Sequence, residues 1–275
     1  MPLADHFVFS ANNLQDYVDC HRRFELKYIR KQDWPAIITK PVQEVEEKIV
    51  RGSRFHRLAH QYLEHIPFEF LDDSIADPQV KEWFSDFTKF IQPYRKDSYY
   101  SEFSSVTTLA NFRVIAVYDF ISVTEDEQLT IADWKTTTIE PKRKFYENKI
   151  QTLLYPIVAF ETFNAIFPDA AEIKPEDQSL IFWFPAFPEK SLGFSFSEEI
   201  YQHNRNGLIA LIREISEKEE GTFEKTEMEI RCGYCQYRSL CDRGVEAGSL
   251  VEMGDLDIEQ LIESISFGES EEISY

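Results

Sequence analysis

The sequence predicts an α/β fold in which helices flank a central sheet that is mixed and mostly antiparallel. Three runs rich in β-branched and aromatic residues follow one another near the middle of the chain, and segments with helical periodicity precede and follow them. The chain has 275 residues, of which 43% are hydrophobic and 15% aromatic, so it can bury a sizeable core. We expect one domain over residues 1–244 and an acidic tail over residues 245–275.

Three helices are expected before the first strand, because apolar residues recur there at helical spacing. Ser10 is a suitable N-cap for the first helix, and Cys20 lies in its middle. Gly52 interrupts the second helix, which indicates a close approach to another backbone. The three helices are expected over residues 10–24, 39–65 and 78–92.

The remaining elements alternate between strands and helices. The first three strands are joined by short turns, which predicts a meander. The acidic tail contains one amphipathic segment, over residues 256–265. Strands are expected over residues 99–108, 112–123, 129–136, 180–187 and 192–196, and helices over residues 144–163 and 198–218.

Two aspartates are expected to meet across a hairpin. If the turn of this hairpin is centred on Asp126, residues whose numbers add up to 252 face each other, and Asp119 and Asp133 are such a pair. Directly opposed residues of an antiparallel pair lie about 4.5–5.5 Å apart. Because strand side chains alternate, Lys135 shares the face of Asp133 and Trp134 takes the other. Two carboxylates that close, with an ammonium beside them, predict a site for a hard divalent ion.

A solvated salt bridge is the usual explanation of an isolated D-x-K sequence. Two observations favour a site here. Asp133 lies in an apolar strand, where a charge is costly without a reason. Its expected partner Asp119 is a second carboxylate, which is not how a stabilising surface pair is built.

The four cysteines are expected to bind one inorganic centre. Cys232-x₂-Cys235-x₅-Cys241 has the compact spacing of metal ligands, Cys20 is the remaining thiol, and the chain has no spare cysteine. Disulfides are disfavoured in the cytosol. Four thiolates suit either structural Zn²⁺ or an iron–sulfur cluster, and their spacing leaves both open.

Together these motifs resemble the PD-(D/E)xK nuclease superfamily, and within it the RecB/AddB-like and CRISPR-adaptation-type iron–sulfur nucleases. Asp119 and Asp133-Trp134-Lys135 match its signature. The family's GxxxH element corresponds to residues 52–56 and its QxxxY element to residues 151–155. Its N-terminal S-x₃-L-x₂-Y-x₂-C-x₃-F pattern is matched by Ser10, Leu14, Tyr17, Cys20 and Phe24. The sequence departs from the family at Ala116, Phe120 and His21, where Gly, Arg and Pro are usual.

The resemblance implies a restriction-endonuclease-like core and a metal-dependent deoxyribonuclease activity. Mg²⁺ or Mn²⁺ would be bound by His56, Asp119, Asp133 and the main-chain carbonyl of Trp134, and Lys135 would orient the attacking water. Further residues would contact DNA or support the site, namely Gln151, Tyr155 and, as an additional acid, Glu102. A [4Fe-4S] cluster on Cys20, Cys232, Cys235 and Cys241 would join the first helix to the C-terminal segment. We expect an exonuclease that acts on single strands or DNA ends, in repair, recombination or DNA processing.

Charge leaves a second function class open. The formal net charge is −20, which argues against a generic nucleic-acid binder. Two local basic segments weaken this argument, and their residues Arg22, Arg23, Lys142, Arg143 and Lys144 are expected to guide DNA. The alternative is a catalytically weak nucleic-acid-binding or scaffold subunit whose acidic tail recruits a protein partner. A zinc site on His56 and His60 is a third possibility, but no third ligand is evident.

The sequence shows no sign of membrane attachment. No apolar run approaches the roughly 18–20 residues that a membrane span needs. The N-terminus lacks a basic region followed by an apolar stretch, so no secretory signal is evident. We therefore expect a cytoplasmic protein that has no membrane partner.

Overall fold

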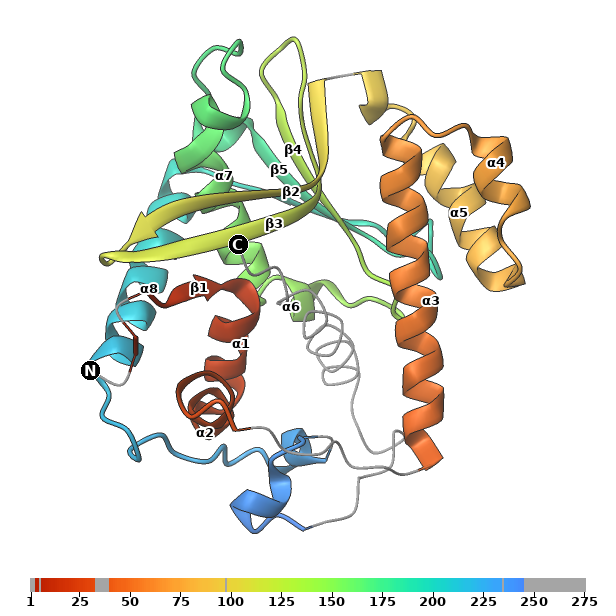
Figure 1. Cartoon of the computed structure of the whole chain (residues 1–275). Coiled ribbons are helices and arrows are strands. Elements are labelled where there is room, and N and C mark those ends of the chain that lie inside the picture. The colour runs from red at the N-terminus through yellow and green to blue at the C-terminus, as the bar shows by residue number, and fades with distance from the viewer. Residues whose placement is uncertain (1–2, 5, 33–39, 97, 234, 245–275) are drawn as a thin grey trace.

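A six-stranded mixed sheet forms the centre of the computed structural model, and helices cover both of its faces (Figure 1). The structure describes residues 3–244 apart from residues 5, 33–39, 97 and 234, so the predicted tail helix lies outside the described residues. Among the described residues, no helix is long and apolar enough to cross a membrane.

The sheet combines parallel and antiparallel pairs. β3 is its central strand and pairs with β1, β2 and β4, while β5 and β6 continue the sheet beyond β4. The pairs β1–β3 and β4–β5 are parallel, and the other pairs are antiparallel. The strands are β1 Val8–Ser10, β2 Ser98–Leu109, β3 Phe112–Val123, β4 Leu129–Trp134, β5 Gln178–Trp183 and β6 Leu192–Ser195.

The register of the β3–β4 hairpin is the predicted one. Its pairs run from Val123 opposite Leu129 to Phe120 opposite Ala132, and the two residue numbers of each pair add up to 252. The length of the short polar turn sets which residues pair. A shift by one residue would move every side chain to the opposite face of the sheet, so the register is strongly specified. The hairpin therefore brings Asp119 and Asp133 to the end of the ladder.

The helices form two groups. α1, α7 and α8 pack with one face of the sheet in the larger core, and α3, α4 and α5 pack with the other face around the buried Trp134 and Trp183 (Figure 1). The helices are α1 Ala11–Asp19, α2 His21–Phe24, α3 Lys40–Leu63, α4 Phe68–Asp73, α5 Pro78–Ile91, α6 Arg143–Tyr146, α7 Ile150–Ile166 and α8 Glu198–Glu217.

Several element predictions need correction. Cys20 does not lie inside a helix, because its backbone is extended (φ −163°, ψ 107°) and it separates α1 from α2. The helix expected over residues 144–163 is divided into α6 and α7. The strand expected over residues 180–187 ends at Trp183, and neither β1 nor α4 was predicted.

The two faces of the β2–β3 hairpin change places along its length, so that side chains that point into one core at one end point into the other core at the other end. On β3, Ala116 and Tyr118 pack in the larger core, whereas Phe120 packs in the core under α3 and α5. On β2 the same change separates Phe103 from Tyr99. Between them Glu102 has a left-handed backbone (φ 48°), which is rare for a residue with a side chain. The change of face therefore centres on Glu102 and on Asp119.

Gly52 lets α3 lie against the end of β4. A Cβ atom added at Gly52 would lie 2.7 Å from Oγ1 of Thr136, closer than atoms normally approach. Thr136 follows Lys135 in the chain. The close approach expected from the glycine is present, but its neighbour is a side chain and not a backbone.

We expect Gly52→Ala to lower the free energy of unfolding in urea by ~1 kcal/mol or more, because overpacking outweighs the gain in helix propensity. Thr136→Ala removes the clashing oxygen and should restore the stability of the double variant. Gly207→Ala in α8 is the matched control, since nothing lies within 4 Å of an added Cβ there. Equal effects of alanine at Gly52 and Gly207 would contradict this account.

Candidate active site

Asp119 closes the end of the β3–β4 ladder with its side chain. Its Oδ2 accepts a hydrogen bond from the main-chain N–H of Trp134 at 2.7 Å. Its other oxygen, Oδ1, lies 3.4 Å from Nδ1 of His56 on α3. The carboxylate therefore replaces a backbone acceptor on one side and faces an imidazole on the other.

Asp133 is held on the opposite strand by two side chains. Its Oδ2 lies 2.9 Å from Nζ of Lys135, and its Oδ1 accepts a hydrogen bond from Nε2 of Gln151 at 2.6 Å. The side chains of Asp133 and Lys135 are 6% and 9% exposed. A buried charge that loses its partner is energetically costly. The paired and hydrogen-bonded arrangement of Asp133 is therefore strongly preferred over alternatives.

Gln151 and Tyr155 both face this pair from the first turns of α7. Burial raises the pKa of Tyr155 well above its ordinary value, and the negative charge of Asp133 raises it further. A hydrogen bond from Gln151 acts in the opposite direction. The i, i+4 spacing read from the sequence therefore corresponds to one helix face that meets the two charged residues.

His56 carries a proton more readily than a free histidine. Burial lowers its pKa, but Asp119, Glu102 and Asp133 outweigh this effect and raise the pKa to about 9. The neighbouring carboxylates therefore favour the protonated imidazole. A metal ion that binds His56 would have to displace this proton.

Glu102 completes a group of three possible metal ligands. One ligand atom each of His56, Glu102 and Asp119 lies within 4.8 Å of the others. Burial and the negative charge of Asp119 raise the pKa of Glu102 to about 7, although His56 lowers it. The left-handed backbone of Glu102 had no sequence signal, and its position opposite Asp119 follows from the β2–β3 register.

The donor atoms of this group suit a divalent metal ion. Carboxylate oxygens are preferred by Mg²⁺ and Mn²⁺, and an imidazole nitrogen adds affinity for transition metals. Asp133 lies outside the group of three, because its oxygens face Lys135 and Gln151. Its role as a direct ligand, and that of the Trp134 carbonyl, stay predictions.

Other predicted residues have different surroundings. His60 Nδ1 lies 2.8 Å from Oγ of Ser101, so the structure gives His60 a partner other than a shared metal with His56. Arg143 donates a hydrogen bond to the carbonyl of Gly193 at 2.9 Å and braces β6. Lys142 and Lys144 are exposed beside it. The prediction that this segment guides DNA is compatible with these positions and stays a prediction.

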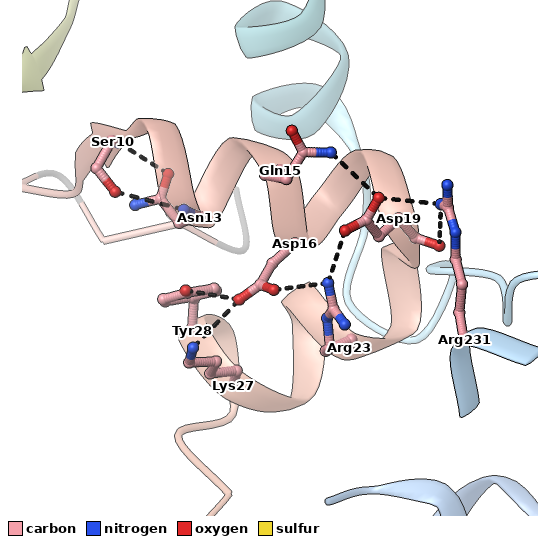
Figure 2. Close-up of polar contacts among 9 residues, drawn as sticks. All are labelled: Ser10, Asn13, Gln15, Asp16, Asp19, Arg23, Lys27, Tyr28 and Arg231. Atoms are coloured by element: carbon pink, nitrogen blue, oxygen red, sulfur yellow. Dashed lines mark hydrogen bonds and ion pairs between the residues drawn. The ribbon is translucent and has the colours of Figure 1, made fainter. Parts of the chain in front are cut away.

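Arg22 and Arg23 form ion pairs inside the protein. Arg23 contacts Asp16 at 2.8 Å and Asp19 at 3.0 Å, and Arg22 pairs with the buried Glu25. Figure 2 shows Arg23 between the two aspartates of α1. Their charges are largely neutralised, so the geometry gives these arginines a structural role rather than a DNA-guiding one.

The cysteine-bearing segments are brought together by ion pairs. Arg231 lies 3.0 Å from Oδ1 of Asp19 and also donates to the main-chain oxygen of Asp19 (Figure 2). Cys20, which follows Asp19, is near enough to Cys232, which follows Arg231, to raise the pKa of its thiol. All four thiols are free. We call the contact of residues 19 and 20 with residues 229–233 and 235–241 the clasp.

The thiols of the clasp influence one another. Burial raises the pKa of Cys232 and of Cys241, and Cys20 raises both further. Burial also raises the pKa of Cys235 to about 11, with a further contribution from Cys20 and a lowering by Arg23. The described cysteines do not form a group with all ligand atoms within 4.8 Å.

Comparison with known proteins identifies the family. The chain matches the family model of the PD-(D/E)XK nuclease superfamily over residues 8–242. No curated protein matches it. Among solved structures, the protein SSO0001 is 9% identical with a TM-score of 0.41, and the match covers 87% of each chain. A protein of Eubacterium rectale described as a candidate exonuclease is 12% identical with a TM-score of 0.48, over 82% of this chain and 86% of that one.

The family match includes every residue of the site. Its range begins at β1 and ends after Cys241, so it contains the metal-ligand group, the Asp133–Lys135 pair and the clasp. On this match, the chain belongs to the PD-(D/E)XK nuclease superfamily.

Proposed function

We propose that this protein is a metal-dependent deoxyribonuclease that hydrolyses phosphodiester bonds. The observation that carries the proposal is the juxtaposition of two units. His56, Glu102 and Asp119 form one unit, and Asp133 with Lys135 and Gln151 forms the other. Asp119 and Asp133 link the two units, because they lie on the adjacent strands β3 and β4. The first unit suits a divalent cation, and the second holds a buried ammonium beside it.

Mg²⁺ or Mn²⁺ would be held by His56, Glu102 and Asp119, with Asp133 and the Trp134 carbonyl as further proposed ligands. Such an ion activates water and neutralises charge on a phosphodiester. The carboxyl groups converge although burial and the negative charge of Asp119 raise the pKa of Glu102. A cation would relieve this repulsion.

Lys135 would orient the attacking water and stabilise negative charge on the phosphate. Its ammonium lies 2.9 Å from Oδ2 of Asp133, and the side chain is 9% exposed. Preorganised charges in a site that excludes water act strongly on developing charge. Gln151 supports this geometry by its hydrogen bond to the other oxygen of Asp133.

DNA is the proposed substrate, as single strands or duplex ends, and the proposed roles are exonucleolytic processing in repair or recombination. Lys142 and Lys144 are exposed on the segment that follows the active strand. Phosphate contacts from such lysines would offset the net charge of −20 locally. The resemblance to RecB/AddB-like enzymes supports the same substrate class.

A catalytically weak DNA-binding or scaffold subunit is the second candidate. The observation that favours it is the internal pairing of Arg22 and Arg23, which removes one of the two expected basic surfaces. DNA binding without cleavage would support this alternative. The acidic tail as a site for a basic protein partner belongs to the same proposal.

We also propose that the clasp binds a [4Fe-4S] cluster. Four thiolates suit either structural zinc or an iron–sulfur cluster, and the resemblance to the iron–sulfur nucleases favours the cluster. The free thiols and the Asp19–Arg231 pair support a site that closes a loop of more than 200 residues.

The catalytic assignment predicts that Asp133→Ala and Lys135→Ala each lower DNA cleavage with Mn²⁺ by about 100-fold or more, because each removes charge from the reacting centre. The measurement is degradation of end-labelled DNA. Asp86→Ala and Lys89→Ala are matched controls, since these residues form an exposed pair at 2.8 Å on α5. Cleavage by the two site variants at the rate of the controls would rule the assignment out.

The proposed cluster predicts a brown protein after anaerobic purification, with about four iron atoms per chain. Cys232→Ala should lose the visible absorption, whereas Ser239→Ala in the same segment should keep it. Metal analysis and the visible spectrum are the measurements. A colourless protein with one zinc per chain would favour structural zinc instead.

The crowding of acids predicts a stability that depends on pH in the metal-free protein. The pKa of Glu102 is raised from 4.5 to about 7 in the folded state. The stabilisation of the folded state by this carboxyl group is therefore fully present below pH 4.5 and is lost as pH rises through 7. Glu102→Gln should therefore raise the melting temperature relative to wild type at about pH 8 but not at about pH 4.

The melting temperatures are measured with a chelator present, so that the protein is free of metal. Glu189→Gln is the control, because Glu189 is exposed. Added Mn²⁺ should stabilise the wild-type protein more than Glu102→Gln, because the variant has lost a proposed ligand. A variant that is destabilised at both pH values would show that Glu102 is not under electrostatic strain.

A further inference from the structure

Gln15 links the clasp to the helix that carries Gln151. Its Oε1 accepts a hydrogen bond at 3.0 Å from the main-chain N–H of Ile150, the first residue of α7, 135 residues away in sequence. Its Nε2 donates at 3.1 Å to Oδ1 of Asp19 (Figure 2). The orientation of the amide is fixed, because a main-chain N–H can only donate and a carboxylate can only accept.

The bond to Ile150 replaces a local helix cap. Lys149 is the N-cap residue of α7, and its side chain makes no capping bond. The first N–H groups of a helix have no partner within the helix, and a cap normally comes from the residue just before it. Here the cap comes from α1, so the first turn of α7 is set by the position of α1.

The capped turn carries the residue that holds the catalytic carboxylate. Gln151 follows Ile150 and donates to Oδ1 of Asp133 at 2.6 Å. On the other side of Gln15, Oδ1 of Asp19 also lies 3.0 Å from Arg231, the neighbour of Cys232. Hydrogen bonds and an ion pair therefore run from the clasp to Ile150, and its covalent neighbour Gln151 continues the link to Asp133.

We propose that Gln15 is a positioning residue, which sets the first turn of α7 so that Gln151 holds Asp133, and which couples this geometry to the clasp. The inference rests on the proposed nuclease function. Gln15 itself touches neither the metal-ligand group nor the Asp133–Lys135 pair. Its effect on catalysis is exerted through Gln151.

The test is a double-mutant cycle in the full-length protein. Gln15→Leu should lower kcat for DNA cleavage about fivefold with little change in KM, because a lost cap loosens the turn that carries Gln151. In a Gln151→Ala background the same substitution should change kcat by less than about 1.5-fold, since the residue through which it acts is gone. Gln202→Leu is the matched control, because Gln202 donates at 2.9 Å to the exposed Glu198 one helical turn away.

Two kinetic outcomes would overturn the proposal. One is an unchanged kcat of Gln15→Leu. The other is an equal fall in both backgrounds, which would show that Gln15 acts independently of Gln151.

A second measurement does not depend on activity. In nuclear magnetic resonance spectra, Gln15→Leu should move the main-chain amide signal of Ile150 and the side-chain amide signals of Gln151, whereas Gln202→Leu should leave them unchanged. Gln151→Ala identifies the side-chain signals. Unmoved signals would overturn the proposed role of Gln15, even if the wild-type protein cleaves DNA. A wild-type protein that does not cleave DNA would overturn the proposed function. The spectra would still decide whether Gln15 positions Gln151.

Discussion

The hydrogen bond from the main-chain N–H of Trp134 to the side chain of Asp119 ends the β3–β4 ladder and positions the candidate site. Where β3 and β4 separate, a carboxylate replaces the backbone acceptor, so the ladder ends without leaving a buried donor unpaired. The same carboxylate presents its other oxygen to His56. The neighbouring Asp133 is fixed by Lys135 and Gln151. The bond that gives the main-chain N–H of Trp134 a partner thus also holds the Asp119 carboxylate where a cation can bind it.

Backbone conformation brings Glu102, the third member of the proposed ligand group, to His56 and Asp119. β2 and β3 change faces at Glu102 and Asp119, so helix α3 on one side and α7 on the other both reach the same point. The left-handed conformation of Glu102 is costly for a residue with a side chain, and such conformations concentrate at functional sites. Burial and the charge of Asp119 raise the pKa of Glu102, so its ionised form is disfavoured in the metal-free fold.

Ion pairs and a hydrogen bond hold the N-terminal helices against the segments that carry residues 221 and 231. Asp16 and Asp19 on α1 receive Arg23 and Arg231, and the buried Glu25 accepts a hydrogen bond from the main-chain N–H of Gly221. Breaking one partner of a buried pair strands the other charge, so these contacts restrict how the C-terminal segment can move. Through Gln15 the contacts of Asp19 extend to Ile150 in the first turn of α7, next to Gln151, which donates to Asp133.

The sequence by itself determined the features with a local period. The turn at Asp126 and strand alternation fixed the hairpin register, and the four-residue spacing of Gln151 and Tyr155 placed both on one helix face. Tertiary structure alone decided what depends on distant segments. β1, with three residues, forms only because β3 offers a parallel partner. The extended Cys20, the left-handed Glu102, the internal pairing of Arg23 and the cap from Gln15 follow in the same way from contacts between segments far apart in sequence, and periodicity carries no information about such contacts.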